Sequence, residues 1–322
     1  MVIDEAAQAL EAACWIALPR GGRCVLAGDH RQLPPIVQGV YPEPADGEPL
    51  LHRSIFESLQ AQVGSDGYTS VLLENFRMNR TLTRYPAGQI YVPGYQPVDE
   101  QVGSRLLTVD HGAANALTEE VIDPRYPLVV VVTDGVRAAA ENRVEAALVA
   151  RVALEFRMRL RDLGGERYPE GPAGDARFWR DGLFIVSPHH AQINAVQLAL
   201  AAGRNWASKP FVGTVDKMQG QECDAVITSY GVADIEYAAE EKDFIYSLNR
   251  LNVAVTRGRA KTIVFLSRAL LEPPLASYEE DATAEGISFM QGLVQFARHH
   301  GTESEHPLEG GASAAIYRVP LL

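Results

Sequence analysis

Two adjacent carboxylates stand near the first residue, directly after a short apolar pair. Val2 and Ile3 lead into Asp4 and Glu5, the start of the string DEAAQ. At the end of a strand, such a pair suits metal and water chemistry, because one carboxylate can bind Mg²⁺ while the next polarises an attacking water. Acidic residues are equally favoured at the N-terminus of a helix, where they interact with the helix dipole. The pair alone is compatible with either interpretation.

A second polar cluster follows the next apolar run. Residues 24–27 (CVLA) are typical of a short buried strand, and the string GDHRQLPP follows at 28–35. Pro34 and Pro35 exclude a helix, so Gln32 is expected in a loop. Because open α/β sheets bind ligands beyond the carboxyl ends of their strands, both clusters are candidates for ligand binding.

The bulk composition is that of a globular protein. The chain has 322 residues, of which 47% are hydrophobic, enough for one large domain or two ordinary ones. No apolar run reaches the roughly 18 residues of a membrane helix, and no basic segment typical of a secretory signal opens the chain. The three cysteines lack CxxC spacing, which argues against zinc. We therefore expect a cytoplasmic protein with no membrane partner.

The net charge of −12 at first disfavours a nucleic-acid partner. Half of it belongs to residues 270–322, which contain eight acids and two arginines. This segment is rich in small residues and proline, and we expect it to be partly ordered or loose. The remaining chain is compatible with a groove that contacts phosphates through backbone amides and hydroxyls.

Apolar runs alternate with helical patterns along the chain. Strands are expected at 23–28, 70–75, 127–133, 183–187, 225–230 and 262–267, and helices at 141–163 and 191–202. This alternation predicts a parallel sheet covered by helices on both faces. The stretches 38–52 and 164–182, rich in Gly and Pro, are expected to be insertions or linkers.

Four further strings follow DEAAQ and GDHRQLPP in order. They are LLENFRMN at 72–79, IVSPHHAQINAVQLAL at 185–200, GTVDKMQGQECDAVITSYG at 213–231 and RLNVAVTRGRAK at 250–261. The whole set resembles the C-terminal part of the superfamily I helicases of the Upf-like branch, which includes the nonsense-decay RNA helicase and the Dna-two-type replication helicases. The resemblance covers roughly residues 1–268.

The resemblance implies an α/β fold of the RecA-like, P-loop NTPase type, in which each domain is a parallel sheet flanked by helices. ATP would bind between two such domains, with single-stranded DNA or RNA across the top. Residues 1–75 are expected to form a partial first domain and residues 76–270 a complete second one. Residues 271–322 are expected to be an acidic C-terminal tail.

The resemblance also implies roles for individual residues. Asp4 would bind magnesium (Mg²⁺), Glu5 would activate the hydrolytic water, and Gln32 would sense the γ-phosphate. Arg77 and Arg257 would act as arginine fingers, since their planar charged forks suit phosphoryl transfer. The other implied contacts are Glu222 and Gly220 with the nucleotide, and Ser187, His189 and Thr214 with the nucleic-acid backbone. Taken singly, each has an ordinary alternative, such as a surface ion pair for Arg257.

Two motifs depart from the family's pattern. The family's Tyr-Arg-Met-His-Pro is FRMNR at 76–80, which keeps the arginine but loses the proline. The family's Thr-Pro-Tyr is SPH at 187–189, so an imidazole replaces a ring that could stack on a base or nucleotide.

A larger departure concerns the phosphate loop, GxxxxGK[ST], whose amides and lysine hold the phosphates of ATP. The lysines are Lys209, Lys217, Lys242 and Lys261, and only Lys261 precedes a Ser or Thr. It follows an alanine rather than a glycine, so the motif does not occur in these residues. We expect the loop to lie upstream of Met1 in a longer helicase, and this chain alone to lack ATPase activity.

Three functions follow from these observations. The first is the C-terminal portion of an ATP-dependent DNA or RNA helicase or translocase, partnered by the missing N-terminal half or by a nuclease domain. The second is a non-catalytic nucleic-acid- or protein-binding module derived from a helicase. The third, an unrelated α/β nucleotide-binding enzyme, is disfavoured by the ordered motifs.

Overall fold

The computed structural model describes residues 1–37, 53–63 and 68–322, and the stretch 38–52, where we expected an insertion or linker, lies outside them. The chain divides into two compact units, Met1–Leu72 (unit 1) and Leu73–Leu322 (unit 2), which we describe separately. None of the described helices combines the length and apolar character that crossing a membrane requires.

Unit 1 is built on two short parallel strands. Strand β1 (Val2–Ile3) pairs with β2 (Val25–Leu26), and helices α1 (Glu11–Cys14) and α2 (Ile55–Val63) accompany them. Among the described residues of unit 1 the buried core is small, and Val2 and Val25 are 70% and 60% exposed. Parallel strands are normally covered on both faces, so the exposed apolar side chains of this pair are unusual.

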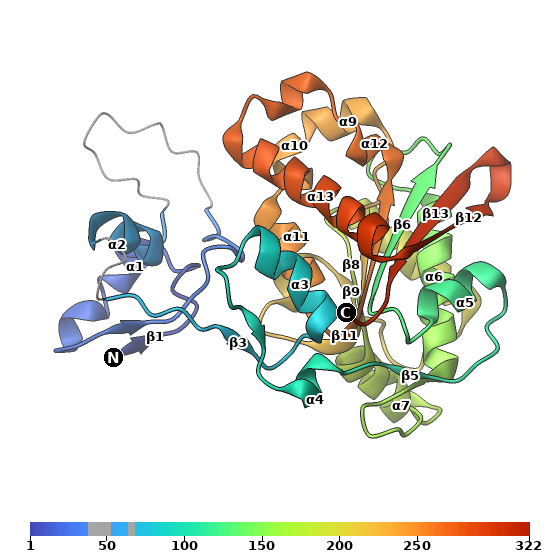
Figure 1. Ribbon diagram of the computed structural model, residues 1–322, viewed down its shortest axis with the longest axis horizontal. Coiled ribbons are helices and arrows are strands. Elements are labelled where there is room, and N and C mark those ends of the chain that lie inside the picture. The colour runs from blue at the N-terminus through green and yellow to red at the C-terminus, as the bar shows by residue number, and fades with distance from the viewer. Residues whose placement is uncertain (38–52, 64–67) are drawn as a thin grey trace. The chain divides into compact units, whose positions relative to one another are not determined.

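Unit 2 contains a seven-stranded, mostly parallel sheet in the order β12-β13-β6-β11-β10-β8-β9 (Figure 1). Five strands are mutually parallel, and β12 and β13 extend the sheet in antiparallel fashion. This is the α/β architecture of a RecA-like domain, as the alternation of apolar runs predicts. The strands are β6 (Leu128–Asp134), β8 (Leu183–Val186), β9 (Val212–Gly213), β10 (Cys223–Ser229), β11 (Gly258–Ser267), β12 (Thr302–Pro307) and β13 (Ser313–Val319).

Alternating side chains of the sheet build two cores. In β6, Val129 and Val131 enter one core, whereas Val130 and Val132 enter the other. Because both of their faces are buried, β6 and β8 are apolar at nearly every position. The first core is covered by α5 (Ala116–Ile122), α6 (Arg143–Arg159) and α8 (His190–Gly203), and the second by α3 (Arg80–Gln89), α11 (Leu248–Val255) and α13 (Asp281–His300).

Shorter elements connect these layers. They are β3 (Glu74–Asn75), β4 (Gln96–Pro97), α4 (Glu100–Gly103), β5 (Thr108–Val109), β7 (Leu160–Arg161), α7 (Pro172–Arg177), α9 (Ile235–Glu240), α10 (Lys242–Ile245) and α12 (Arg268–Leu271). The stretch 164–182 is more than a linker, because Tyr168 and the helical turn Phe178–Gly182 pack aromatic side chains into the first core.

The expectation of a C-terminal tail that is only partly ordered or loose is wrong. Helix α13 buries Ile287, Met290 and Leu293 in the second core, and β13 pairs with β6 along seven residues. The acids of α13, such as Glu285, lie on its exposed face, so the segment is acidic in composition yet amphipathic in pattern. Residues 281–319 therefore complete the sheet of unit 2 rather than trail from it.

Candidate nucleotide and nucleic-acid sites

Three residues that the resemblance implies for the nucleotide belong to segments that meet at the amino end of β10. Arg77 follows β3, Glu222 directly precedes β10, and Arg257 directly precedes β11. The Arg77 Nε donates to Glu222 Oε2 at 2.8 Å, and its Nη1 donates to the Thr256 carbonyl at 3.3 Å. The Arg257 carbonyl accepts from the Cys223 amide at 3.4 Å. Residues more than 140 positions apart in sequence thus share one edge of the sheet.

Two asparagines fix the segment that carries Arg77. The Asn75 Oδ1 accepts from the amides of Arg77 and Met78, at 3.1 and 2.6 Å. Asn79 caps α3 by accepting from the Leu82 amide at 3.0 Å, and its Nδ2 donates to the Ala260 carbonyl at 2.9 Å. An asparagine cap therefore starts α3 in the motif that lacks the family's proline, and it also ties the helix to β11.

Arg257 is buried, with only 3% of the residue exposed. The ordinary alternative of a solvated surface arginine is therefore wrong. Burial of a permanently charged guanidinium is costly unless it is compensated, and such compensation occurs mostly where the charge has a use.

Sequence reasoning missed two residues of this edge, Arg259 and Asp224. Arg259 lies 3.7 Å from Glu222 and 2.8 Å from Asp224, so Glu222 has a second cation beside it. Burial raises the pKa of Asp224 to about 6, although Arg259 opposes that rise. The signal in the sequence was a single acid in an otherwise apolar strand. Gly220, two residues before Glu222, has a φ of 70°, a left-handed conformation that favours glycine.

The residues implied for nucleic acid lie at the opposite edge of the sheet. Ser187 follows β8 and Thr214 follows β9, and the Ser187 amide donates to the Gly213 carbonyl at 3.0 Å. His189 is the N-cap of α8, and its ring centroid is 5.3 Å from that of Phe244. Burial lowers the pKa of His189, which favours the neutral imidazole. Residues 214–222 connect this carboxyl edge, at β9, to the amino end of β10.

A buried polar network also belongs to the carboxyl edge. Glu145, in the first turn of α6, accepts from Ser229 Oγ at 2.6 Å and from the Gly231 amide at 2.9 Å. Gln192 of α8 donates to the same Ser229 hydroxyl at 2.9 Å. Burial, the dominant effect, raises the pKa of Glu145 to about 7. Sequence analysis did not single out this residue, whose position gives no sign of full burial.

Glu145→Gln is expected to remove a pH dependence of stability. Between the ordinary pKa of 4.5 and about 7, the folded state keeps a proton that the unfolded state has lost, so stability falls as pH rises through this window. The difference corresponds to about 3 kcal/mol at 1.4 kcal/mol for each pH unit. Urea unfolding should find the variant equal to the native chain at pH 5 and more stable at pH 8. Equal stability at both values, or the same result for the exposed Glu141→Gln, would contradict this.

Unit 1 places its two polar clusters side by side. Because β1 and β2 are parallel neighbours, Asp4 and Glu5 leave the same edge as GDHRQLPP, and the Ala6 amide donates to the Ala27 carbonyl at 2.8 Å. Gly28 is required there, since a Cβ at this position would lie 2.8 Å from the Ala7 nitrogen. Gln32 Nε2 donates to Asp29 Oδ2 at 2.9 Å within the following loop.

Glu5 has a strained backbone. Its φ is 53°, and among the described residues it is the only non-glycine with a positive φ. Such conformations cost of order 1–3 kcal/mol and cluster at functional sites. The Glu5 Oε2 accepts from Gln8 Nε2 at 2.7 Å, and the Asp4 Oδ1 accepts from the Glu5 amide at 3.0 Å. Both carboxylates are exposed and have oxygen atoms to offer.

The carboxylates of unit 1 would supply only some of the ligands of a magnesium ion, as is common for this ion in proteins. Across the described residues, no group of three or more His, Cys, Asp or Glu side chains could hold a metal ion. Mg²⁺ is commonly bound by one or two carboxylates together with waters and substrate phosphates. Asp4 supplies one such carboxylate, so it would hold the ion together with a nucleotide, while Glu5 would act on the attacking water.

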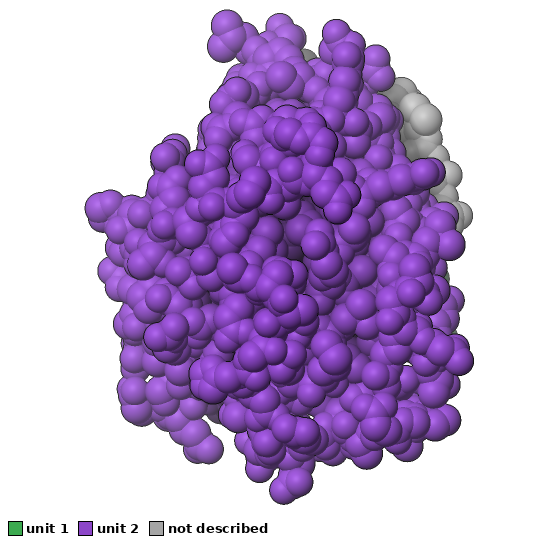
Figure 2. Space-filling model, turned by 90° about the vertical axis from the view of Figure 1, so that its right-hand side faces the viewer, with its two compact units in different colours: residues 1–72 green, residues 73–322 purple. Residues whose placement is uncertain are grey.

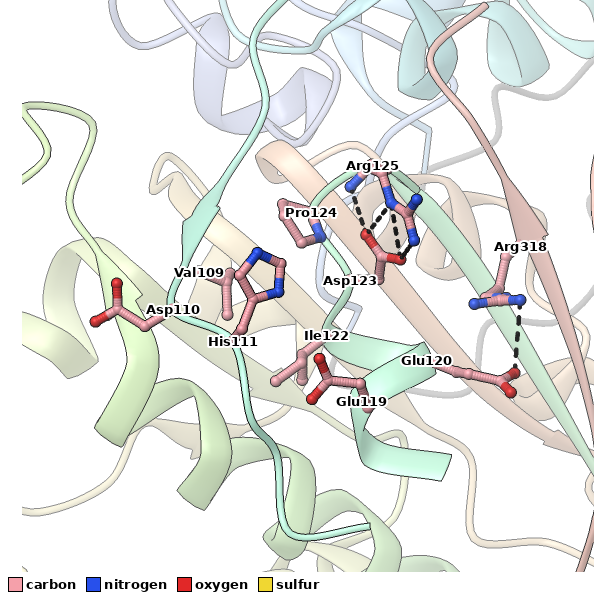
Figure 3. A pocket seen from close by; sticks show the side chains of 10 residues that line it. All are labelled: Val109, Asp110, His111, Glu119, Glu120, Ile122, Asp123, Pro124, Arg125 and Arg318. Carbon is pink, nitrogen blue, oxygen red and sulfur yellow. Dashed lines mark hydrogen bonds and ion pairs between the residues drawn. The ribbon is translucent and has the colours of Figure 1, made fainter. Parts of the chain in front are cut away.

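A cavity of about 190 Å³ in unit 2 contains none of the residues singled out by sequence (Figure 3). It lies beside α5 and the loop before β6, and charged side chains dominate its lining. Its lining includes two ion pairs, between Asp123 and Arg125 at 2.6 Å and between Glu120 and Arg318 at 3.7 Å. Because these charges satisfy one another, we assign the cavity no part in the candidate sites.

Sequence comparisons relate the chain to known proteins over most of its length. Residues 51–269 match the family described as AAA domain, and residues 1–39 match a second family with the same description. The chain is 29% identical over 307 residues to the DNA-binding protein SMUBP-2 of Mesocricetus auratus, covering 94% of this chain and 27% of that protein. It is 27% identical over 277 residues to the DNA polymerase alpha-associated DNA helicase A of Saccharomyces cerevisiae, covering 82% and 37%.

A third relative combines two activities in its name. The chain is 24% identical over 286 residues to the DNA replication ATP-dependent helicase/nuclease DNA2 of Xenopus laevis, covering 82% of this chain and 24% of that protein. The chain therefore spans about a quarter to a third of the length of the relatives it matches.

Proposed function

The chain belongs to the AAA domain family, as a C-terminal region of superfamily I helicases, and from this premise we propose that it is the C-terminal portion of an ATP-dependent helicase or translocase. In this proposal it couples ATP hydrolysis to movement on single-stranded nucleic acid. The names of relatives refer to DNA binding and to ATP-dependent helicases, which supports ATP and nucleic acid as its ligands.

One observation carries the proposal furthest. The segments of Arg77, Glu222 and Arg257 meet at the amino edge of the sheet, and Ser187 and Thr214 lie at its carboxyl edge. Residues 214–222 join the two edges in a single short segment. A displacement of this segment at one edge would therefore move residues at the other edge, as coupling between hydrolysis and strand movement requires.

Each of the candidate site residues would have a separate role at the nucleotide. Mg²⁺-ATP supplies the phosphoryl group and the charge that must be stabilised. Asp4 would position the ion, Glu5 would accept a proton from the attacking water, and Gln32 would contact the γ-phosphate. The Arg77 and Arg257 guanidiniums would stabilise the charge that develops during transfer, and Glu222 with Gly220 would contact the nucleotide.

A partner segment completes the proposal. Holding the β-phosphate requires a phosphate loop, and the motif GxxxxGK[ST] does not occur in these 322 residues. We propose that residues 1–75 contribute to a first RecA-like domain whose other strands cover the exposed side chains of Val2 and Val25. Residues 76–270 would form the second domain, with its sheet completed by residues 271–322.

A non-catalytic module that binds nucleic acid is the second candidate, favoured by the same missing motif. Both candidates predict that the chain alone binds single-stranded oligonucleotides weakly, with an affinity that falls steeply as salt rises. Fluorescence anisotropy of a labelled oligothymidine across a salt series measures this. No binding even at low salt would contradict both candidates, and binding that does not respond to salt would contradict contact through phosphates.

A further inference from the structure

Two arginines share the carboxylate of Glu222. Its Oε2 accepts from Arg77 Nε at 2.8 Å, and its Oε1 lies 3.7 Å from Arg259 Nη1. All three residues belong to unit 2, which is purple in Figure 2. The proposed function places Arg77 at the phosphoryl group and Glu222 at the nucleotide, yet the structure pairs the two side chains with each other. The ion pair uses donors and acceptors that both roles need, so it competes with them.

The Arg259 guanidinium is fixed by groups other than Glu222. Its Nε donates to Asp224 Oδ1 at 3.0 Å, and its Nη2 donates to the Asp181 carbonyl at 3.2 Å. The side chain of Asp224 is only 2% exposed, and its Oδ2 accepts from the Tyr168 hydroxyl at 3.4 Å. Arg259 therefore keeps its position whether or not Glu222 is paired with Arg77.

The Arg77 guanidinium is held less firmly than its backbone. The Arg77 amide donates to Asn75 Oδ1 at 3.1 Å, and its carbonyl accepts from Arg105 Nη1 at 3.0 Å. The side chain is 29% exposed, and beyond Glu222 it donates to the Thr256 carbonyl at 3.3 Å. Partly exposed ion pairs contribute little to stability, whereas a phosphate binds a guanidinium strongly and often bidentately. A phosphoryl group can therefore draw Arg77 from Glu222 by rotation of the side chain alone.

Departure of Arg77 changes what Glu222 can do. Its Oε2 loses the donor at 2.8 Å and becomes free to accept a hydrogen bond, while Arg259 remains beside Oε1. A carboxylate accepts hydrogen bonds and is repelled by phosphates, so at a nucleotide it suits the hydroxyl groups of the sugar. Without a fixed cation next to it, the carboxylate would turn away from the phosphates. Arg259 supplies that cation.

We propose that the nucleotide replaces Arg77 as the partner of Glu222, and that Arg259 is the positioning residue that holds this carboxylate during the exchange. The inference rests on the proposed function and gives Arg259 a role that it exerts through Glu222. The Arg77–Glu222 pair is then a restraint that keeps the guanidinium from the phosphoryl group until a nucleotide binds.

Arg259→Lys tests the positioning role in a polypeptide that joins this chain to a segment carrying GxxxxGK[ST]. One ammonium group can pair with the buried Asp224 but cannot also reach Glu222, because it lacks the fork of arginine. The KM for ATP should rise about five-fold and kcat should stay within about two-fold, since a ground-state contact is weakened. A purely structural role would lower the fraction of active enzyme, and with it the apparent kcat, at an unchanged KM.

Glu222→Gln tests the restraint. The side chain of Glu222 is 43% exposed, so the variant is expected to fold. Release of Arg77 from the ion pair should raise kcat about three-fold, while KM also rises because a neutral amide is the weaker acceptor. A residue that only contacts the nucleotide would raise KM without raising kcat. A kcat for Glu222→Gln at or below the native value would overturn the inference.

The double variant Arg259→Lys/Glu222→Gln tests whether Arg259 acts through Glu222. Its KM should equal that of Glu222→Gln alone, because Arg259 then has no carboxylate to position. Arg180→Lys is the matched control, since Arg180 forms an exposed ion pair with Asp181 at 2.7 Å, and it should change neither constant.

The outcomes separate the inference from the proposed function. Absence of turnover by the native joined polypeptide contradicts the proposed function, and the inference with it. Turnover with a native KM in Arg259→Lys overturns only the exchange at Glu222. A KM of the double variant that multiplies the two single effects does the same, because Arg259 would then act independently of Glu222.

Discussion

Arg257→Lys is expected to lower the kcat for ATP hydrolysis about 10³-fold in a polypeptide that joins this chain to a segment carrying GxxxxGK[ST]. An arginine finger contributes between about 10³ and 10⁵ to kcat in phosphoryl transfer, through a planar fork that an ammonium group cannot reproduce. Arg257 is buried, and its carbonyl accepts from the amide of Cys223 in the strand that follows Glu222. The lysine variant keeps the charge and most of the packing.

The KM for ATP separates a role in catalysis from a role in folding. A residue that acts on the transition state should lower kcat and leave KM nearly unchanged. Arg151→Lys, at an exposed position of α6, serves as the matched control and should behave as the native sequence. A kcat for Arg257→Lys within about three-fold of the native value would remove Arg257 from the proposed mechanism.

Most of unit 2 could be predicted from the sequence, because its strands are buried on both faces. A run such as LVVVVT in β6 has no polar alternation to confuse with a surface strand. The ranges expected for α6 and α8 also agree with the structure, since their apolar residues recur at helical spacing. Range 70–75 contains β3, but that strand pairs with β4 in a separate small sheet.

The prediction for the C-terminal segment was wrong because it relied on amino-acid composition rather than on the spacing of the apolar residues. Residues 270–322 were expected to be partly ordered or loose because of their acids and small residues, yet the buried positions of α13 recur every three or four residues. Strand β12 is almost wholly polar and exposed, so only its pairing with β13 reveals it. Strand β9 has two residues, too few for a pattern.

The sequence predicted which residues belong to the candidate site but not which of them are in contact. Ordered motifs singled out Arg77 and Glu222, whereas their 2.8 Å ion pair depends on how β3 and β10 are brought together.

Glu5→Gln is expected to abolish turnover in the polypeptide that contains the phosphate loop. Glutamine cannot accept the proton of the attacking water, and loss of general-base catalysis alone typically costs 10²–10⁴-fold. Nucleotide binding should persist, because glutamine preserves the size of the side chain and leaves Asp4 to position the ion. The strained φ of 53° at Glu5 remains in the variant, so the comparison isolates the carboxylate. Loss of ATP binding together with turnover would assign Glu5 to structure instead of catalysis.

The most direct measurement is ATP turnover stimulated by single-stranded nucleic acid, compared between the 322-residue chain and the same chain joined to a segment with GxxxxGK[ST]. We expect little or no turnover by the chain itself, since the motif GxxxxGK[ST], whose amides and lysine hold the β-phosphate, does not occur in its sequence. We expect stimulated turnover by the joined polypeptide, lost again in Glu5→Gln. Robust turnover by the 322-residue chain, itself abolished by Glu5→Gln, would contradict the account.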